Sequence, residues 1–131
     1  MQPDPRSIAH TCAYGHAHAN ALSGRVGSVY ITRFDVSMAH ASGAQGDREA
    51  IHAAICRDMI AACLESGVCK SFTVCGRGDT FSRLEAYHSL PGADTTMYHD
   101  ELQPKPTYDA VYDTLRRYVI ALANMPCPAA G

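Results

Sequence analysis

The pattern of hydrophobic and polar positions predicts two strands in this chain. Residues 28–36, SVYITRFDV, are rich in β-branched and aromatic side chains and are bounded by Gly27 and Ser37, as a strand would be. The apolar positions of this segment break strict alternation, which is typical of a strand covered on both faces. Residues 70–75, KSFTVC, form the second predicted strand, which the turn residues GRGD follow.

Two helices are predicted from apolar residues spaced three and four apart. The first covers residues 47–65, with Asp47 as its N-cap and Gly67 as its stop signal. Its predicted apolar face consists of Ile51, Ala54, Ile55, Met59, Ala62 and Cys63. The second covers residues 107–124, with Thr107 as its N-cap. Its predicted apolar face consists of Val111, Leu115, Tyr118, Val119 and Leu122.

The other segments are predicted to be loops. Residues 1–27 are rich in Ala, Gly and His with weak periodicity, residues 76–106 are rich in Gly and Pro, and residues 125–131 form a tail. The order strand, helix, strand, long loop, helix predicts a parallel crossover in an α/β fold. No internal repeat or linker divides the chain into two domains.

Composition narrows the class of protein. A chain of 131 residues, 47% hydrophobic and 18% charged, suits one domain. It is too short for a closed eightfold β/α barrel, which needs about 250 residues. The formal net charge of −2 gives no basic surface for nucleic acid. No apolar run approaches the roughly 20 residues of a membrane span, and the first residues, MQPDPRSIAH, lack the apolar core of a secretory signal.

The six cysteines leave several pairings open. Six thiols allow 15 disulfide connectivities, so the sequence alone does not fix one. Cys63 and Cys69 are separated by LESGV, a segment short enough to turn between a helix end and a strand start. On spacing alone the two are equally well explained as a disulfide or as two buried thiols.

Three sequence features suggest a binding or catalytic role. The first is an N-terminal HxC…HxH cluster made of His10, Cys12, His16 and His18, side chains that bind zinc or copper. Its spacing matches no standard zinc finger, so a chance accumulation of His is the alternative. The second is the triplet Arg77-Gly78-Asp79, which is read as a turn after a strand rather than as an adhesion motif.

The third feature is Arg33, a cation inside an apolar strand. Such a residue must reach solvent, pair with a carboxylate such as Asp35 or Asp79, or face a polar cavity. Acidic catalytic candidates are scarce, because Glu occurs only at positions 49, 65, 85 and 101. No nucleophile elbow, GxGxxG motif or P-loop is present.

Three segments in order carry a family resemblance. They are VYITRFDV (29–36), ACLESGVCKSFTVCGRGDTFSRL (62–84) and QPKPTYDAVYDTL (103–115). Together they resemble the C-terminal part of glycoside hydrolase family ten, the retaining endo-β-1,4-xylanases. The resemblance implies an α/β fold that is a partial TIM (β/α)8 barrel, comprising about the last two β/α units with parallel strands. Residues 28–124 would be this part of the barrel, and residues 1–27 a possible remnant of the sixth β/α unit.

The resemblance also places the family's functional positions in this chain. Arg33 stands where the family has its nucleophile, a Glu. Cys75 and Arg83 stand where the family has Trp residues, the first of which lines the sugar site, and His18 matches a His that hydrogen-bonds the nucleophile. Cys63 and Cys69 match a pair that many members join as a disulfide.

Further scaffold positions match the family's later motifs. They are Asp79 and Ser82 after the second strand, and Asp100, Pro104, Lys105, Pro106, Tyr108, Asp109 and Ala110 in the closing segment.

These replacements predict a xylanase-like chain that is catalytically impaired. Retaining glycosidases need two carboxyl groups about 5–5.5 Å apart, and we expect neither the nucleophile nor the family's acid/base Glu in this chain. The expected ligand is xylan or a xylooligosaccharide, without a cofactor, and the resemblance implies an extracellular protein. Two alternatives stay open: a non-catalytic carbohydrate-binding or interaction protein, and a small metal-binding protein that uses the N-terminal His residues. Unpaired strand edges also predict self-association.

Overall fold

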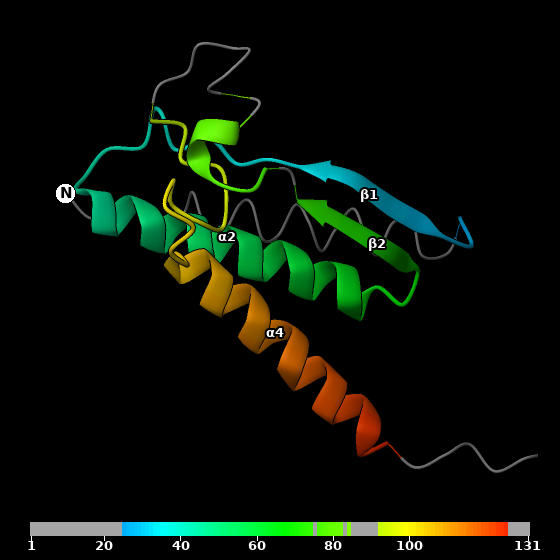
Figure 1. The fold of residues 1–131 in the computed structure, drawn as a ribbon. Helices are drawn as coiled ribbons and strands as arrows, with labels where there is room; N and C mark the ends of the chain where they lie inside the picture. Colours follow the sequence, from blue (N-terminus) through cyan, green and yellow to red (C-terminus); the bar gives the residue numbers. More distant parts are fainter. Residues whose placement is uncertain (1–24, 75, 83, 85–91, 126–131) are drawn as a thin grey trace, which may run out of the picture.

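The computed structural model describes residues 25–74, 76–82, 84 and 92–125. Strands β1 (Val29–Phe34) and β2 (Cys69–Val74) form a two-stranded parallel sheet, and helix α2 (Gln45–Glu65) connects them (Figure 1). Val29 pairs with Cys69 and Phe34 with Val74. The β-branched and aromatic residues of both segments favour this extended conformation. The predicted parallel crossover is therefore confirmed.

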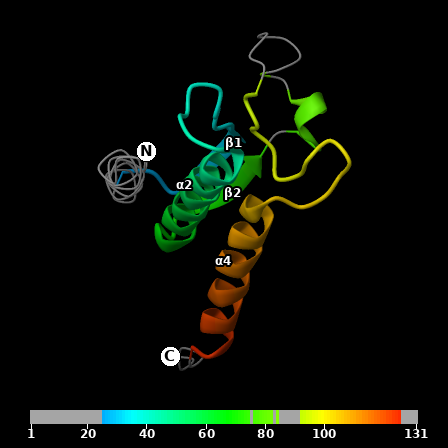
Figure 2. The ribbon, with the colours of Figure 1, turned by 90° about the vertical axis from the view of Figure 1, so that its left-hand side faces the viewer.

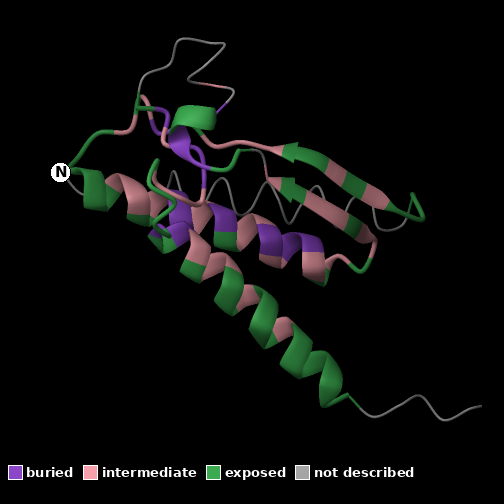
Figure 3. Ribbon diagram, viewed as in Figure 1, coloured by how far each residue is buried: buried purple, intermediate pink, exposed green. Residues whose placement is uncertain are grey.

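The elements stack in three layers. Helix α2 lies along one face of the sheet, and helix α4 (Pro106–Ala123) packs against α2 on the side away from the strands (Figures 1 and 2). The buried apolar residues of α2 form most of the core (Figure 3). They are Ala53, Cys56, Ile60, Ala62 and Cys63.

The predicted apolar face of α2 was only partly correct. Ala62 and Cys63 are buried, but Ile51, Ala54, Ile55 and Met59 are only half-buried. The fully buried stripe includes the polar His52, because α2 packs against the sheet on one side and against α4 on another. A pattern of one apolar face predicts packing against one neighbouring element, whereas α2 packs against two, the sheet and α4.

The ends of α2 also differ in part from the prediction. The helix begins at Gln45 with Ala44 as its N-cap, so Asp47 lies inside the first turn rather than capping it. A carboxylate there still interacts favourably with the helix dipole. At the other end Gly67 adopts a φ of +69°, a conformation in which Gly is favoured, and this confirms it as the stop signal.

Helix α4 begins one residue earlier than predicted. Lys105 is its N-cap and Pro106 opens the first turn, where a missing N–H is tolerated. Thr107 is therefore inside the helix and completely buried. Of the predicted apolar face, Val111 and Tyr118 are half-buried, while Leu115, Val119 and Leu122 are exposed.

The exposure of these α4 residues has a simple reason. Only one side of α4 contacts α2, and no other described element covers the adjacent side.

The first strand departs from its prediction in the same way, because Tyr30 is 62% exposed and β1 is not covered on both faces. Within the described ranges, no helix is long and apolar enough to cross a membrane.

Candidate functional site

The loops that follow the two strands meet at one end of the sheet. Both strand arrows point toward this end, where the short helix η1 (Asp79–Phe81) lies (Figure 1). Proteins built from parallel strands and helices place their ligands at the carboxyl ends of the strands, because the connecting loops converge there. We therefore take this end as the candidate site.

Arg33 is the last residue but one of β1, and it forms an ion pair. Its Nε donates to a carboxylate oxygen of Asp35, two residues along the chain. The side chain of Arg33 is 37% exposed and that of Asp35 is 13% exposed. The guanidinium of Arg33 thus lies at a partly solvated rim beside a carboxylate, which is one of the arrangements expected from the sequence.

Asp79 anchors the loop that follows β2. Its side chain is buried, and one carboxylate oxygen accepts hydrogen bonds from the Thr96 hydroxyl at 2.9 Å and the Thr96 N–H at 3.2 Å. The other oxygen pairs with the ammonium of Lys105, a residue only 1% exposed. Because both oxygens of its carboxylate are bound inside the protein, Asp79 is not exposed as an adhesion motif would require. The triplet Arg77-Gly78-Asp79 is therefore a turn after a strand.

A second buried polar group joins α2 to α4. His52 Nδ1 shares a hydrogen bond with the Thr107 hydroxyl at 2.7 Å, and His52 Nε2 lies 3.8 Å from the Cys56 sulfur. Burial, together with the nearby Lys105 ammonium, lowers the pKa of His52 to about 4. Burial also raises the pKa of the Cys56 thiol to about 12. Both groups are therefore neutral near pH 7 and serve packing rather than proton transfer.

The sequence pattern did not predict this buried cluster of His52, Cys56 and Thr107. His52 and Cys56 lie one helical turn apart, a spacing that places two side chains on the same face. The partner of His52, Thr107, is 55 residues farther along the chain, where the sequence pattern predicts a helix cap. The four-residue spacing could have indicated the contact between His52 and Cys56. No sequence pattern indicates the contact between His52 and Thr107.

Further hydrogen bonds hold the loops around η1. Ser82 and Thr95 share a hydroxyl hydrogen bond of 2.6 Å, and the Thr80 N–H donates to Asp100 at 2.6 Å. The hydrogen bonds from Thr80 lower the pKa of Asp100, which keeps that exposed carboxylate ionised. Gly76 has a φ of +94°, and a Cβ there would lie 2.7 Å from the Thr96 methyl group. A side chain at position 76 would therefore clash with Thr96.

A polar pocket of about 360 Å³ opens between these loops and the start of α2. Its lining consists of carboxylates, amides, one imidazole and one Gly: Gln45, Asp79, Gly92, Asp94, His99, Asp100, Glu101 and Gln103. One wall is fixed by Arg48, whose guanidinium donates to Gly92 O at 2.7 Å and to Asp94 at 2.6 Å. The pocket offers many hydrogen-bond acceptors, and its described lining residues include no Phe or Tyr.

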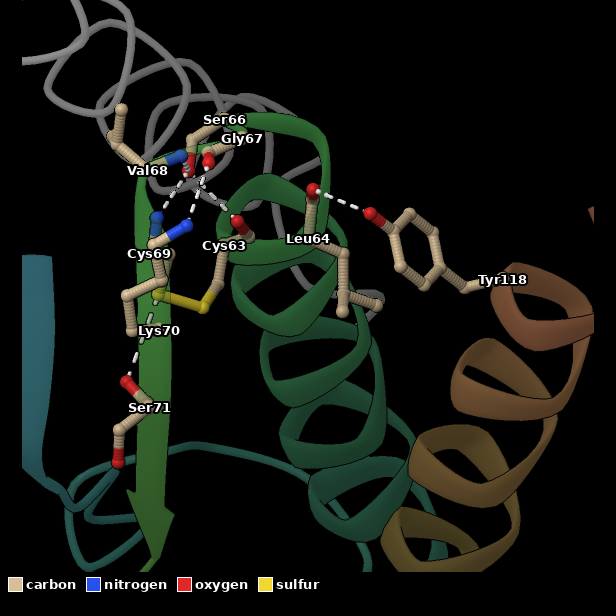
Figure 4. Close-up of a disulfide and its surroundings, with 9 residues drawn as sticks. All are labelled: Cys63, Leu64, Ser66, Gly67, Val68, Cys69, Lys70, Ser71 and Tyr118. Atoms are coloured by element: carbon tan, nitrogen blue, oxygen red, sulfur yellow. Dashed lines mark hydrogen bonds between the residues drawn. A yellow bond between two sulfur atoms is a disulfide. The ribbon is translucent and has the colours of Figure 1, made fainter. Parts of the chain in front are cut away.

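The Cys63–Cys69 disulfide lies at the opposite end of the sheet (Figure 4). It joins the end of α2 to the start of β2, with 5.1 Å between the Cα atoms. Ser66 stabilises the turn between them, since its hydroxyl donates to Cys63 O and accepts from the Cys69 N–H. This is the pair that the family resemblance implies, and its place makes it a structural crosslink rather than part of the site.

Several predicted site residues lie outside the described ranges. They are the sugar-site positions His18, Cys75 and Arg83, and the remaining members of the His-rich cluster, His10, Cys12 and His16. Their roles stay predictions. Within the described ranges, no group of three His, Cys, Asp or Glu side chains could hold a metal ion.

Comparison with known proteins gives a consistent result. The family model of glycosyl hydrolase family 10 matches residues 15–114. Xylanase 10B from Thermotoga petrophila, solved with xylobiose, is 24% identical with a TM-score of 0.61, over 70% of this chain and 28% of that one. A thermostable mutant of a xylanase from Cellvibrio japonicus is 26% identical with a TM-score of 0.62, over 86% and 36%.

A mutant of xylanase A from P. fluorescens subsp. cellulosa, in complex with xylopentaose, is 26% identical with a TM-score of 0.61, again over 86% and 36%. The chain thus spans about a third of the length of these solved structures. A comparison with curated proteins returned no match.

Proposed function

The chain belongs to glycosyl hydrolase family 10 and folds as part of a (β/α)8 barrel, and we propose that it recognises xylan chains without hydrolysing them. Two of the similar structures were solved with xylobiose and xylopentaose, which supports a β-1,4-xylooligosaccharide as the ligand class. The proposal of lost hydrolysis rests on the side chain at position 33.

Arg33 carries this proposal. The resemblance in sequence matches Arg33, in β1, to the family's nucleophilic Glu, and the guanidinium of Arg33 is paired with Asp35. A retaining glycosidase forms a glycosyl ester on a carboxylate, while a second carboxyl group about 5–5.5 Å away acts as acid and base. A guanidinium forms no such ester.

Electrostatics at this position also opposes the reaction. The transition state of glycoside hydrolysis resembles an oxocarbenium ion, so positive charge develops on the sugar. Arg remains protonated at any accessible pH. A fixed cation in the place of the nucleophile raises the energy of that transition state, whereas a carboxylate lowers it.

A hydrolysis assay tests the first half of the proposal. The purified chain is incubated with xylan, and reducing ends are measured beside an Arg33→Ala variant purified in the same way. We expect no release above background from either protein. Turnover by the wild-type chain that disappears in Arg33→Ala would contradict the proposal, and the matched variant excludes a contaminating xylanase as its source.

A binding assay tests the second half. Titration with xylohexaose in a calorimeter is expected to give saturable binding, and cellohexaose provides the control for sugar type. Absence of measurable binding to xylohexaose would refute recognition of xylan.

We further propose that the protein functions in an oxidising compartment, as its family resemblance suggests. The Cys63–Cys69 disulfide supports this, because such bonds persist outside reducing cytosol. Alkylation of free thiols before and after reduction, followed by intact mass measurement of protein from its native source, tests the proposal. Full alkylation of Cys63 and Cys69 without reductant would contradict it.

A further inference from the structure

Helix α4 carries a stripe of exposed apolar side chains on the side that α2 does not cover. Tyr112, Leu115, Val119 and Leu122 are between 43% and 62% exposed. Single exposed apolar residues are common, but four of them along one side of a helix form a continuous patch, and such a patch marks an interaction surface. Among the described elements, only α2 packs closely against α4.

The spacing of these four residues is typical of a helix that pairs with another helix along its length. They follow one another at intervals of three, four and three residues. This is the pattern of a and d positions in a seven-residue repeat, which keeps one stripe facing a neighbouring helix. Tyr112 and Val119 are the a positions, and Leu115 and Leu122 are the d positions. Tyr118, which bonds to α2, lies outside this stripe.

The second half of α4 is open to such a neighbour. It projects beyond α2 and the sheet (Figures 1 and 2), and every residue from 119 to 125 is exposed. In an antiparallel pair of identical helices, the projecting half of each α4 would lie beside the first half of the other. The whole length of the stripe would then be covered.

The charged residues beside the stripe favour a second copy of this chain as the neighbour. Asp109 and Arg116 are exposed and occupy e positions, which face each other across an antiparallel pair. In the register that sets Tyr112 beside Leu115 of the other copy, Asp109 of each copy faces Arg116 of the other. Two-fold symmetry forms this contact twice. A parallel pair would set e positions against g positions, which carry no charge in this helix.

We propose that α4 is a homodimer interface, in which the apolar stripes of two copies pack antiparallel and are flanked by two ion pairs between Asp109 and Arg116. Burial of the apolar side chains supplies the affinity, and the ion pairs fix direction and register. One pair of helices forms a small interface, so the dimer is in equilibrium with the monomer. The interface uses neither the strand edges nor the polar pocket, and it is therefore independent of xylan recognition.

Sedimentation velocity of the full chain over a series of protein concentrations tests the proposal. The wild type should change from monomer to dimer as the concentration rises. Val119→Lys places a charge inside the seam and should weaken dimerisation about tenfold or more. Ile120→Lys is the matched control, because Ile120 is also exposed on α4, at 50%, but lies outside the stripe, and it should leave dimerisation unchanged. Equal thermal midpoints of the two variants show that folding is intact.

A charge swap tests the register. Arg116→Glu sets two carboxylates opposite each other and should weaken dimerisation about fivefold, and adding Asp109→Lys should restore it. Pairing through the strand edges, or a parallel pair of helices, predicts no such rescue, so its absence would overturn the proposal. Dimerisation of Val119→Lys equal to that of the wild type would do the same. A wild type that stays monomeric at every concentration would also overturn it and would assign the stripe to a different partner.

Discussion

The buried ion pair between Asp79 and Lys105 gives the sharpest prediction about the scaffold of the site. Asp79→Asn removes the negative charge but keeps an oxygen that can accept the two hydrogen bonds from Thr96. Lys105 is 1% exposed, so its ammonium would be left in the interior without its anion. Removing one partner of a buried pair lowers the free energy of unfolding by about 3–5 kcal/mol.

The assay is urea unfolding of four proteins followed by circular dichroism: the wild type, Asp79→Asn, Lys105→Met and the double variant. A loss of this size approaches the total stability of a small domain, so all titrations contain the same concentration of trimethylamine N-oxide to preserve folded baselines. The double variant should recover most of the loss, because it removes both charges together. Arg57→Gln, which breaks the more exposed Arg57–Asp58 pair, is the matched control, with an expected change below about 1 kcal/mol.

Two results would refute this reasoning. One is a loss in Asp79→Asn no larger than that in Arg57→Gln. The other is a double variant whose stability equals the sum of the two single changes, since independent effects exclude a direct interaction. In Lys105→Met the pKa of His52 should also rise, because the nearby ammonium is one cause of its depression.

The remaining predictions concern pH and the disulfide. His52 has an ordinary pKa of 6.5 and a folded pKa of about 4, so the unfolded chain binds more protons in this window and stability falls as the pH falls. Between pH 7 and pH 5 we expect a loss of about 2 kcal/mol in urea unfolding, which His52→Gln should abolish; an unchanged pH dependence in that variant would exclude His52 as the source. The Cys63–Cys69 bond closes a short loop, with a sequence separation of 6, and a Cys63→Ser, Cys69→Ser double variant should be less stable by about 2 kcal/mol. Its xylohexaose affinity should be unchanged, because the bond lies at the end of α2 whereas the pocket lies at the start of α2, and a large loss of affinity would contradict that separation.

The order and type of the main elements could be predicted from local sequence. The β-branched runs of the two strands and the three- and four-residue spacing of α2 and α4 depend on short-range preferences. The boundaries agree within two residues, and the pairing of Arg33 with Asp35 is one of the three arrangements that the sequence left open for Arg33.

Burial was harder to predict, because it depends on distant partners. His52 and Lys105 are polar, and a polar residue is assigned to solvent unless its partner is known. Those partners, Thr107 and Asp79, come close only after the fold forms. The exposed positions Leu115 and Val119 of α4 show the opposite error, since an apolar stripe indicates a face that can be buried and not whether a neighbour covers it.

Most of the site residues that the resemblance implies stay predictions, because His18, Cys75 and Arg83 lie outside the described residues. Family motifs directed attention to Arg33, which the structure places at the rim of the sheet. Phe81 matches no motif residue, although it is exposed on a turn that the buried Asp79 and Ser82 hold in place. No local pattern in the sequence announces an exposed aromatic that is held in place.

The central claim is that position 33 no longer supplies a nucleophile, and covalent trapping tests it most directly. An activated 2-deoxy-2-fluoro-β-xylobioside with a dinitrophenolate leaving group needs no acid catalyst, so a nucleophilic carboxylate is enough to form a stable glycosyl ester. Intact mass measurement should show no added glycosyl group on the wild-type chain and one added group on the carboxylate introduced by Arg33→Glu. Stoichiometric labelling of the wild-type chain would contradict the account.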